Sequence, residues 1–501
     1  MADEKAISSS PQEEAHNHDD GPIQRPRGLI YKGVRLFGKD FWYAMPSAQL
    51  LMVSLVCFMC PGMFNALSGM GGAGLTDPSA AAKANTALYA TFAGVAFFAG
   101  TITNVLGVRL TLAIGGMGYT VYIAAFFCYA HTENMGFVLF SGFFLGVCAG
   151  MLWTAQGAIM MSYPEERNKG RYISWFWVIF NLGAVIGSLI PLAQNIQNTE
   201  ANINDGTYAA FLVLTFVGAM LSLTLVNAKS VVRRDGTKVI LMKNPTWKTE
   251  FIGLYQTVVH DPWVIALFPL FFSSNVFYPY QQNQYNALYF STRGRALNGV
   301  LYWAAQILGA LTFGYAMDLR NIRRSIRAKA CYVMLVALTF AVWGGGWATQ
   351  KDKPTREVAQ GGGYRLMDWE EDGSSYIGPM FMYFFYGLFD AVYQTAIYWF
   401  MGALSNSGRK SANYAGLYKG LQSAGAAIFW DLDSRKIPVK TMFGVTWGVV
   451  AAGLLFAFPV VWFRIKDSVP LEEDLRFSDE TVQDVTVKDI GGSEDKQVGG
   501  A

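Results

Sequence analysis

Charge, histidine and cysteine are scarce in this chain, and each shortage excludes a class of protein. Charged residues make up 15% of the 501 residues, against about 25% in soluble domains, so a soluble globular protein is disfavoured. The net charge of +3 is too small to indicate a nucleic-acid partner. The five cysteines all fall inside apolar stretches, and the four histidines lie in a tail or at loop edges. The sequence therefore predicts no disulfide framework, no metal site and no cofactor.

The chain also lacks the motifs of common membrane enzymes and pumps. It contains no His-Glu-x-x-His, no Walker phosphate-binding loop and no Gly-x-Ser-x-Gly. A metalloprotease, an ATP-driven pump and a serine hydrolase are therefore not expected, and the chain is not predicted to be an enzyme. Residues 1–28 have no apolar core of a cleavable signal peptide, so we expect the first membrane helix to direct insertion.

Long apolar stretches are what the chain has in excess, since hydrophobic residues make up 52% of it. A helix rises about 1.5 Å per residue, so about 20 apolar residues cross a hydrocarbon core of about 30 Å. The alternative, buried helices of a large soluble protein, does not fit so many long stretches with so few charges. The sequence predicts an all-α membrane protein with twelve transmembrane helices. They cover 49–70, 84–106, 109–130, 135–161, 172–194, 207–227, 262–281, 296–317, 328–348, 376–404, 411–430 and 441–465.

Basic residues set the orientation, because they gather in the loops of one side if both termini are cytoplasmic. The longest loop on that side follows the sixth stretch and separates two six-helix pseudosymmetric halves, a plan that places a substrate site near the midplane. The plasma membrane and an endomembrane both stay open. The predicted divisions are a cytoplasmic N-terminal tail (1–44), a first half (45–227), a cytoplasmic linker (228–261), a second half (262–466) and an acidic cytoplasmic tail (467–501).

Two loops carry related patterns of glycine and charge. The first loop contains Asn104, Gly107 and Arg109; the second contains Gly314, Asp318, Arg320, Arg323 and Arg324. Both resemble the major-facilitator motif Gly-x-x-x-Asp-Arg-x-Gly-Arg-Arg, in which the acid pairs with arginines or faces a helix N-terminus and so biases the inward and outward states. In the first loop an asparagine replaces the acid, so the charge switch of the first half is largely gone.

Four segments give a more specific resemblance. They read CPGMFNALSGMGGAG (60–74), GMLWTAQG (150–157), YPEERNKGR (163–171) and GLFDAVYQT (387–395). Together they resemble the UNC93-like family in its fungal form, a divergent branch of the major facilitator superfamily. The resemblance implies a multi-pass membrane protein. Some members are linked to potassium homeostasis or act as channel-regulating subunits, and others escort receptors between compartments.

Asp390 is the sharpest single residue, because a carboxylate near the middle of a membrane helix costs about 2.5–3.5 kcal/mol on insertion scales. We expect it to be paired, hydrated or protonated. Lys419 could reach a similar depth, so we predict an Asp390–Lys419 interaction or separate cation and proton roles in one aqueous cavity. A fixed polar tie between helices is the alternative. Further predicted residues of the solute or ion pathway are Asn65, Trp153, Gln156, Asn275, Gln282, Asn283 and Gln394.

Two hypotheses of function follow. The first is a secondary transporter of a small solute or cation in the lipid bilayer, with Asp390 as the coupling residue. The second is a regulatory or chaperone subunit that binds a channel or another membrane protein. Small-residue stripes that face lipid without a partner would favour the second hypothesis, and a central cavity that reaches Asp390 would favour the first. Candidate stripes are Gly142, Gly146 and Gly150, Gly183 with Gly187, and Gly416 with Gly420. We expect them to let helix backbones touch, and sliding surfaces for conformational change are the alternative.

Overall fold

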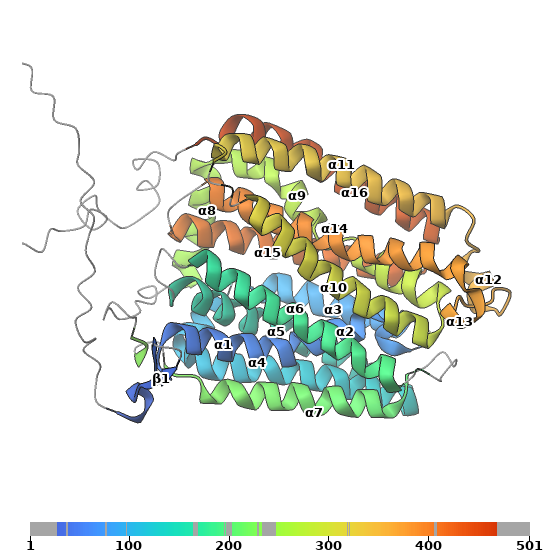
Figure 1. Cartoon of the computed structure of the whole chain (residues 1–501), viewed down its shortest axis with the longest axis horizontal. Helices are drawn as coiled ribbons and strands as arrows, with labels where there is room; N and C mark the ends of the chain where they lie inside the picture. Colours follow the sequence, from blue (N-terminus) through green and yellow to red (C-terminus); the bar gives the residue numbers. More distant parts are fainter. Residues whose placement is uncertain are drawn as a thin grey trace, which may run out of the picture.

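Helices of membrane-spanning length dominate the computed structural model. It describes residues 28–36, 39–75, 78–96, 98–163, 169–194, 196, 203–227, 230–232, 247–317, 319, 321–404 and 408–467. By length and composition, eight described segments could each cross a membrane. The helices α3, α14 and α15 and a broken seventh pass run alongside them in one bundle (Figure 1) and complete the twelve passes. The predicted twelve-helix fold is confirmed.

The passes fall into a first six and a second six. The first six are α1 (Pro46–Met59) with α2 (Pro61–Gly69), α3 (Ser79–Val95), α4 (Ala99–Thr132), α5 (Met135–Ser162), α6 (Lys169–Gln194) and α7 (Asp205–Leu221). The second six are α9 (Phe268–Ser273) with the π-helix η7 (Pro279–Ala287), α10 (Thr292–Met317), α11 (Arg324–Gln350), α14 (Ser374–Leu404), α15 (Gly408–Ser434) and α16 (Val439–Pro459).

Each set of six has its own core. One continuous apolar cluster covers almost entirely residues of the first six passes, and another covers the second six. The second core is rich in aromatic rings, such as Trp343, which packs against Tyr280 and Tyr386. The two halves meet where α3 contacts α15 and where α6 contacts α10. A pathway between the halves is therefore bounded by these helices.

Backbone breaks interrupt three passes. The first pass bends at Cys60, since Pro61 begins α2 and supplies no N–H to the turn before it. Within α4, Gly107 has φ 77° and ψ 158°, a conformation open to glycine. The predicted second stretch, 84–106, is divided between two helices: α3 ends at Val95, and 99–106 form the first turns of α4. The seventh pass ends in η7, and π-helical turns often mark functional sites.

Glycine stripes bring helices of the first half into backbone contact. A Cβ at Gly142 or Gly146 of α5 would collide with the carbonyl oxygens of Ala84 and Leu88 in α3. A Cβ at Gly183 of α6 would collide with the backbone of Phe58 in α1. These stripes are thus used inside the bundle, as their close-packing role requires.

The bundle has two ends that differ in what covers them (Figure 1). One end, here called the hairpin end, carries the short strands β1 (Val34–Leu36) and β2 (Lys39–Phe41) and the helix α8 (Trp247–His260). The antiparallel hairpin, with Val34 opposite Phe41, is a small exception to the predicted all-helical fold. The opposite end, here called the loop end, carries α12 (Arg356–Gln360) and α13 (Trp369–Asp372).

Candidate functional site

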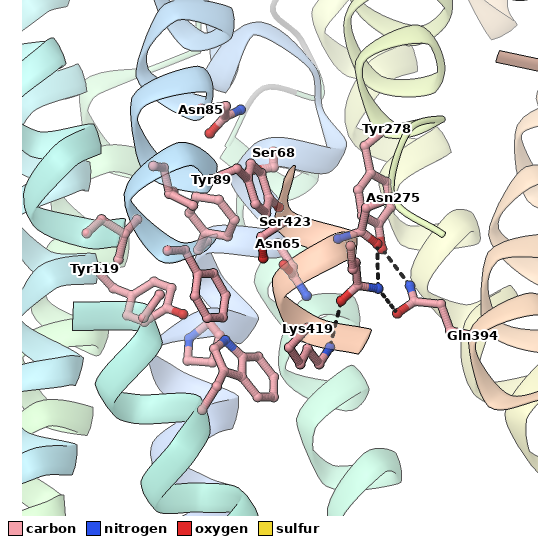
Figure 2. Close-up of a pocket in the computed structure, with 18 of the residues that line it drawn as sticks. Asn65, Ser68, Asn85, Tyr89, Tyr119, Asn275, Tyr278, Gln394, Lys419 and Ser423 are labelled. Carbon is pink, nitrogen blue, oxygen red and sulfur yellow. Dashed lines mark hydrogen bonds between the residues drawn. The ribbon is translucent and has the colours of Figure 1, made fainter. Parts of the chain in front are cut away.

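A cavity lies between the two halves (Figure 2), and the centres of water molecules can occupy about 120 Å³ of it. That is room for several waters or a small solute. Half of the lining residues from the first half are aromatic, and half of those from the second half are amides. We call these two sides the aromatic wall and the amide wall. The aromatic side chains include Phe64, Tyr89, Phe92, Tyr119, Trp153, Trp177 and Phe180; the amides include Asn275, Gln282, Gln306, Gln394 and Gln422.

Asp390 lies directly behind the amide wall and is fully buried. Its Oδ2 accepts hydrogen bonds from Tyr278 Oη at 2.9 Å, Tyr302 Oη at 3.1 Å and Gln306 Nε2 at 2.5 Å. Its Oδ1 accepts from Gln394 Nε2 at 2.6 Å. Tyr278, Gln306 and Gln394 donate to Asp390, and the single O–H of Tyr302 is shared between Asp390 and Gln281 Oε1, which lies 2.9 Å from it. These surroundings suit a carboxylate that only accepts. Three of the four partners, Tyr278, Gln306 and Gln394, also line the cavity. They connect Asp390 to the cavity by direct hydrogen bonds.

Lys419 on α15 connects to Asp390 indirectly, through two glutamines. Lys419 Nζ donates to Gln422 Oε1 at 2.9 Å, and Gln422 Nε2 donates to Gln394 Oε1 at 3.0 Å. Gln394 Nε2 then donates to Asp390. Figure 2 shows Lys419 and Gln394 at the two sides of this chain, which crosses from α15 to α14. Every donor in the chain points from the ammonium toward the carboxylate.

The loop end of the cavity is closed by contacts between the halves. The turn after α2, residues 69–75, presents carbonyl oxygens to the second half. Arg295 of α10, 2% exposed, donates its Nε to Met70 O at 2.7 Å and its Nη2 to Gly71 O at 2.5 Å. Asn286 Nδ2 and Tyr383 Oη each donate to Gly69 O at 2.8 Å. We call this set of contacts the loop-end seal.

A buried ion pair supports the seal from within the second half. Arg356 Nη2 and Asp433 Oδ1 are 2.8 Å apart, with side chains 5% and 1% exposed. Asn283 and Gln284 of η7 also donate to Asp433, at 2.8 and 2.7 Å. The Oδ1 of Asn283 accepts from Gly72 N at 2.8 Å, so this residue joins the ion pair to the first half.

The structure gathers most of the predicted pathway residues around the cavity. Asp390 stands behind the wall, and Asn283 belongs to the loop-end seal. Gln156 is buried, and its Nε2 approaches Met160 Sδ at 3.4 Å, away from the cavity lining. The predicted residues that line the cavity are Asn65, Trp153, Asn275, Gln282, Gln394 and Lys419.

The residues of the predicted first gating motif act within one half. Gly107 produces the bend in α4. Arg109 donates its Nε to Leu223 O at 3.0 Å and so holds the end of α7. The side chain of Asn104 lies outside the described residues. No described contact of this motif crosses to the second half.

The second motif is described only in part, since Asp318 and Arg320 lie outside the described residues. Gly314 does not provide the expected close helix approach, because a Cβ there would meet no neighbouring atom within 4 Å. Arg323 precedes α11 as its N-cap residue. Arg324 Nε donates to Lys466 O at 2.8 Å, and Ser325 binds Asp467. This loop therefore joins the end of the twelfth pass.

Several residues of the site were not predicted from the sequence. Arg295 stands one residue before a predicted membrane stretch, and Asp433 three residues after another. Charges at such edges look like ordinary interfacial residues, and only the fold shows that they are buried. Tyr278, Tyr302 and Gln422 were hidden because a single polar residue in an apolar helix does not reveal its direction. The same holds for Gln306, whose Nε2 donates to Asp390.

Comparison with known proteins gives a consistent relationship. A family model described as the Major Facilitator Superfamily matches residues 41–430. An UNC93-like protein of Schizosaccharomyces pombe is 47% identical over 461 residues, covering 92% of this chain and 91% of that protein. UNC93-like protein 1 of Arabidopsis thaliana is 40% identical over 423 residues, covering 84% of this chain and 91% of that protein.

Solved structures give the same fold. The xylose transporter XylE from E. coli, in a partially occluded inward-open conformation, matches with a TM-score of 0.58 and 13% identity. The match covers 85% of this chain and 100% of the XylE chain. The nucleoside transporter NupG matches with a TM-score of 0.54 and 11% identity, covering 83% of this chain and 100% of its own. At these identities the likeness concerns the fold alone.

Proposed function

Because the chain belongs to the UNC93-like family of the major facilitator superfamily, we propose that it is a secondary transporter. It moves a small solute or ion across the membrane by alternating access, and Asp390 couples the movement to a proton. The observation that carries the proposal is the position of Asp390, buried behind the cavity between the halves and held by residues that line it.

The chemistry of the site supports a proton at Asp390. An ionised carboxylate satisfies the donors Tyr278, Gln306 and Gln394, whereas a protonated one carries an O–H that must displace a donor or find an acceptor. Protonation therefore rearranges the amide wall of the cavity. A bound solute in contact with Gln306 or Gln394 and the proton on Asp390 would each alter the other's binding, which is the linkage that coupled transport requires.

The contacts between the halves support alternating access. The loop-end seal consists of side chains of the second half that bind carbonyl groups of the 69–75 turn. Hydrogen bonds to exposed carbonyls can form and break without unfolding either half, because each half keeps its own core. We infer that the halves rock apart at the loop end when these contacts break, and that the structure represents a state closed at that end.

The alternative function is a regulatory or chaperone subunit for a channel or another membrane protein. It is favoured by Gly444 and Gly448 on α16, a small-residue pair at which a Cβ would meet no atom within 4 Å. A partner helix could pack there. Transport ranks first because the stripes on α5 and α6 are filled inside the bundle and the cavity reaches the partners of Asp390.

We also propose that both termini are cytoplasmic and that residues 228–261 link the halves on that side. The basic loops carry this proposal through the positive-inside rule. Accessibility of a cysteine placed at exposed Asp352 to an impermeant maleimide, in sealed cells, tests it: labelling from outside is expected. Protection from outside labelling would reverse the topology.

Spin-label distances test transport without knowledge of the solute. One pair, Glu133→Cys and Asp352→Cys, spans the loop end, and the other, Val105→Cys and Ile322→Cys, spans the hairpin end; all four positions are exposed. Cys128, the partly exposed native thiol, is replaced by serine. A transporter is expected to give two distance populations for each pair, with a short loop-end distance accompanying a long hairpin-end distance. One fixed distance at both ends would contradict transport and favour the regulatory function.

A further inference from the structure

The charge of the cavity restricts the solute that it can accept. Among the described residues that line it, Lys419 is the one with a charged side chain. Its ammonium has three N–H groups, and one donates to Gln422 Oε1. Its other recorded neighbours are ring faces, with Tyr418, Tyr398 and Trp153 centred 5.3, 5.7 and 5.9 Å away. Ring faces attract a cation but accept hydrogen bonds weakly. The ammonium therefore has capacity for a stronger acceptor.

From this arrangement we propose that the solute is an organic monoanion, a carboxylate on an aromatic or similarly apolar body, carried together with one proton. Its carboxylate pairs with Lys419, and its body lies against Trp153 and Trp177. Asp390 receives the proton. This inference rests on the proposed transport function and names its substrate class.

Charge balance in the site favours a monoanion that is carried together with one proton. In the empty protein the negative Asp390 and the positive Lys419 cancel, and the two glutamines connect them. When a monoanion pairs with Lys419 and a proton neutralises Asp390, the site is again neutral. A buried net charge is costly in a membrane interior. The empty protein and the protein loaded with solute and proton must each change between the two access states. The site therefore carries no net charge in either form.

When the solute is carried together with a proton on Asp390, other solute classes fail this balance. A cation would add a second positive charge beside Lys419, and a neutral solute would leave Lys419 uncompensated. A phosphate dianion would leave negative charge in excess. For phosphate in either charge state, the described lining offers no arginine fork, which suits phosphate better than a lysine does.

The groups around Asp390 leave it as the site of the proton. Its titratable neighbours among the described residues are the phenols Tyr278 and Tyr302, which are hydrogen-bonded to it, and Tyr89, Tyr383 and Tyr418, which lie farther away. Phenols are uncharged at neutral pH. Lys419 is the charged group that faces Asp390, through Gln422 and Gln394. Release of this chain when the solute binds Lys419 frees the carboxylate to take a proton.

The aromatic wall supplies the place for the apolar body. Trp153 and Trp177 stack with centroids 6.5 Å apart and an interplanar angle of 25°. Both line the cavity, and Trp153 faces Lys419. A planar ring that lies against these indoles can therefore hold its carboxylate toward the ammonium.

Calorimetry on the purified full-length protein tests the inference with three probes of one shape. They are benzoate, neutral benzamide and cationic benzamidinium. Benzoate is expected to bind about tenfold or more tightly than either analogue. Lys419→Gln should weaken benzoate by about tenfold or more, while Lys419→Arg and the exposed control Lys440→Gln keep it. Titration in buffers of different ionisation heat should show uptake of about one proton per benzoate, and this uptake should vanish in Asp390→Asn.

Several results would overturn the inference. Benzamide or benzamidinium that binds as tightly as benzoate, Lys419→Gln without effect, binding without proton uptake, or no binding of any probe would each do so. Intrinsic thermal stability of the variants, measured in parallel, shows whether they fold. If the spin-label distances show two states while benzoate fails, transport stands and the anion class is wrong. If the distances are fixed, the proposed function itself is wrong.

Discussion

Gln394 and Asp390 lie one turn apart on α14, and Gln394 Nε2 donates to Asp390 Oδ1 at 2.6 Å. Gln394 binds Oδ1, whereas Tyr278, Tyr302 and Gln306 bind Oδ2. The same glutamine accepts from Gln422 on α15. Gln394 is therefore the point at which the buried carboxylate, the cavity wall and the eleventh pass are joined.

Gln394→Leu is expected to destabilise the protein by about 1–3 kcal/mol, because a buried acceptor loses its donor. The loss should appear as a lower unfolding temperature in a fluorescence-based assay. The double variant Asp390→Leu with Gln394→Leu should recover part of that stability, since the unsatisfied carboxylate is gone. If the stability losses of the single variants Asp390→Leu and Gln394→Leu simply add in the double variant, the two side chains are not coupled.

Arg295→Ala is expected to open the loop-end seal. The substitution removes the donors to Met70 O and Gly71 O and leaves buried carbonyls without these partners. A cysteine at cavity residue Asn65 should then react faster with a maleimide applied from the loop end, while Arg295→Lys, which keeps the charge, should give an intermediate rate. An unchanged rate in Arg295→Ala would mean that these contacts do not limit access.

Gly142→Ala and Gly157→Ala form a matched pair on α5. At Gly142 a Cβ would collide with Ala84 of α3, whereas at Gly157 it would meet nothing within 4 Å. Overpacking should cost Gly142→Ala about 1–3 kcal/mol, and Gly157→Ala should be neutral or slightly stabilising because alanine favours helix. The two unfolding temperatures check this, and equal values would refute the close approach of α3 and α5.

Asp368 is expected to make the loop between α11 and α14 dependent on pH. Burial alone would raise the pKa of Asp368, but hydrogen bonds from Arg293 and Ser291 outweigh it and hold this pKa below its ordinary value of about 3.9. A depressed pKa stabilises the folded loop above the unfolded value, and the gain is lost as pH falls through the folded value. Hydrogen-exchange protection factors of residues 353–372, which are corrected for the intrinsic effect of pH on amide exchange, should therefore be high at neutral pH and fall in strong acid. Asp368→Asn should show low protection factors at every pH, and a protected loop in that variant would contradict the role of the ion pair.

Membrane passes and the buried acid Asp390 could be predicted from the sequence for simple reasons. A run of about 20 apolar residues has few uses other than crossing a bilayer. A single carboxylate in such a run, as at Asp390, is too costly to be incidental. The glycine spacing of Gly142 and Gly146 also indicated close packing correctly, since the stripe meets α3.

The partners of Asp390 could not be predicted, because they depend on how α10, α14 and α15 rotate and slide against one another. Sequence depth placed Lys419 near Asp390, but the lysine turns toward Trp153 and leaves two glutamines between them. Gly314 fits a motif and yet contacts no neighbouring helix. Arg295 and Asp433 stand at the edges of apolar stretches, and their burial follows from loops that fold over them.

The central claim is that a proton on Asp390 controls which end of the protein is closed. It is tested most directly by the two spin-label distances recorded at alkaline and at acidic pH, in the parent protein and in Asp390→Asn. The account predicts that acidification shifts the loop-end and hairpin-end populations in opposite directions in the parent, and that Asp390→Asn keeps one distribution at both pH values. The same pH response in Asp390→Asn as in the parent would contradict it.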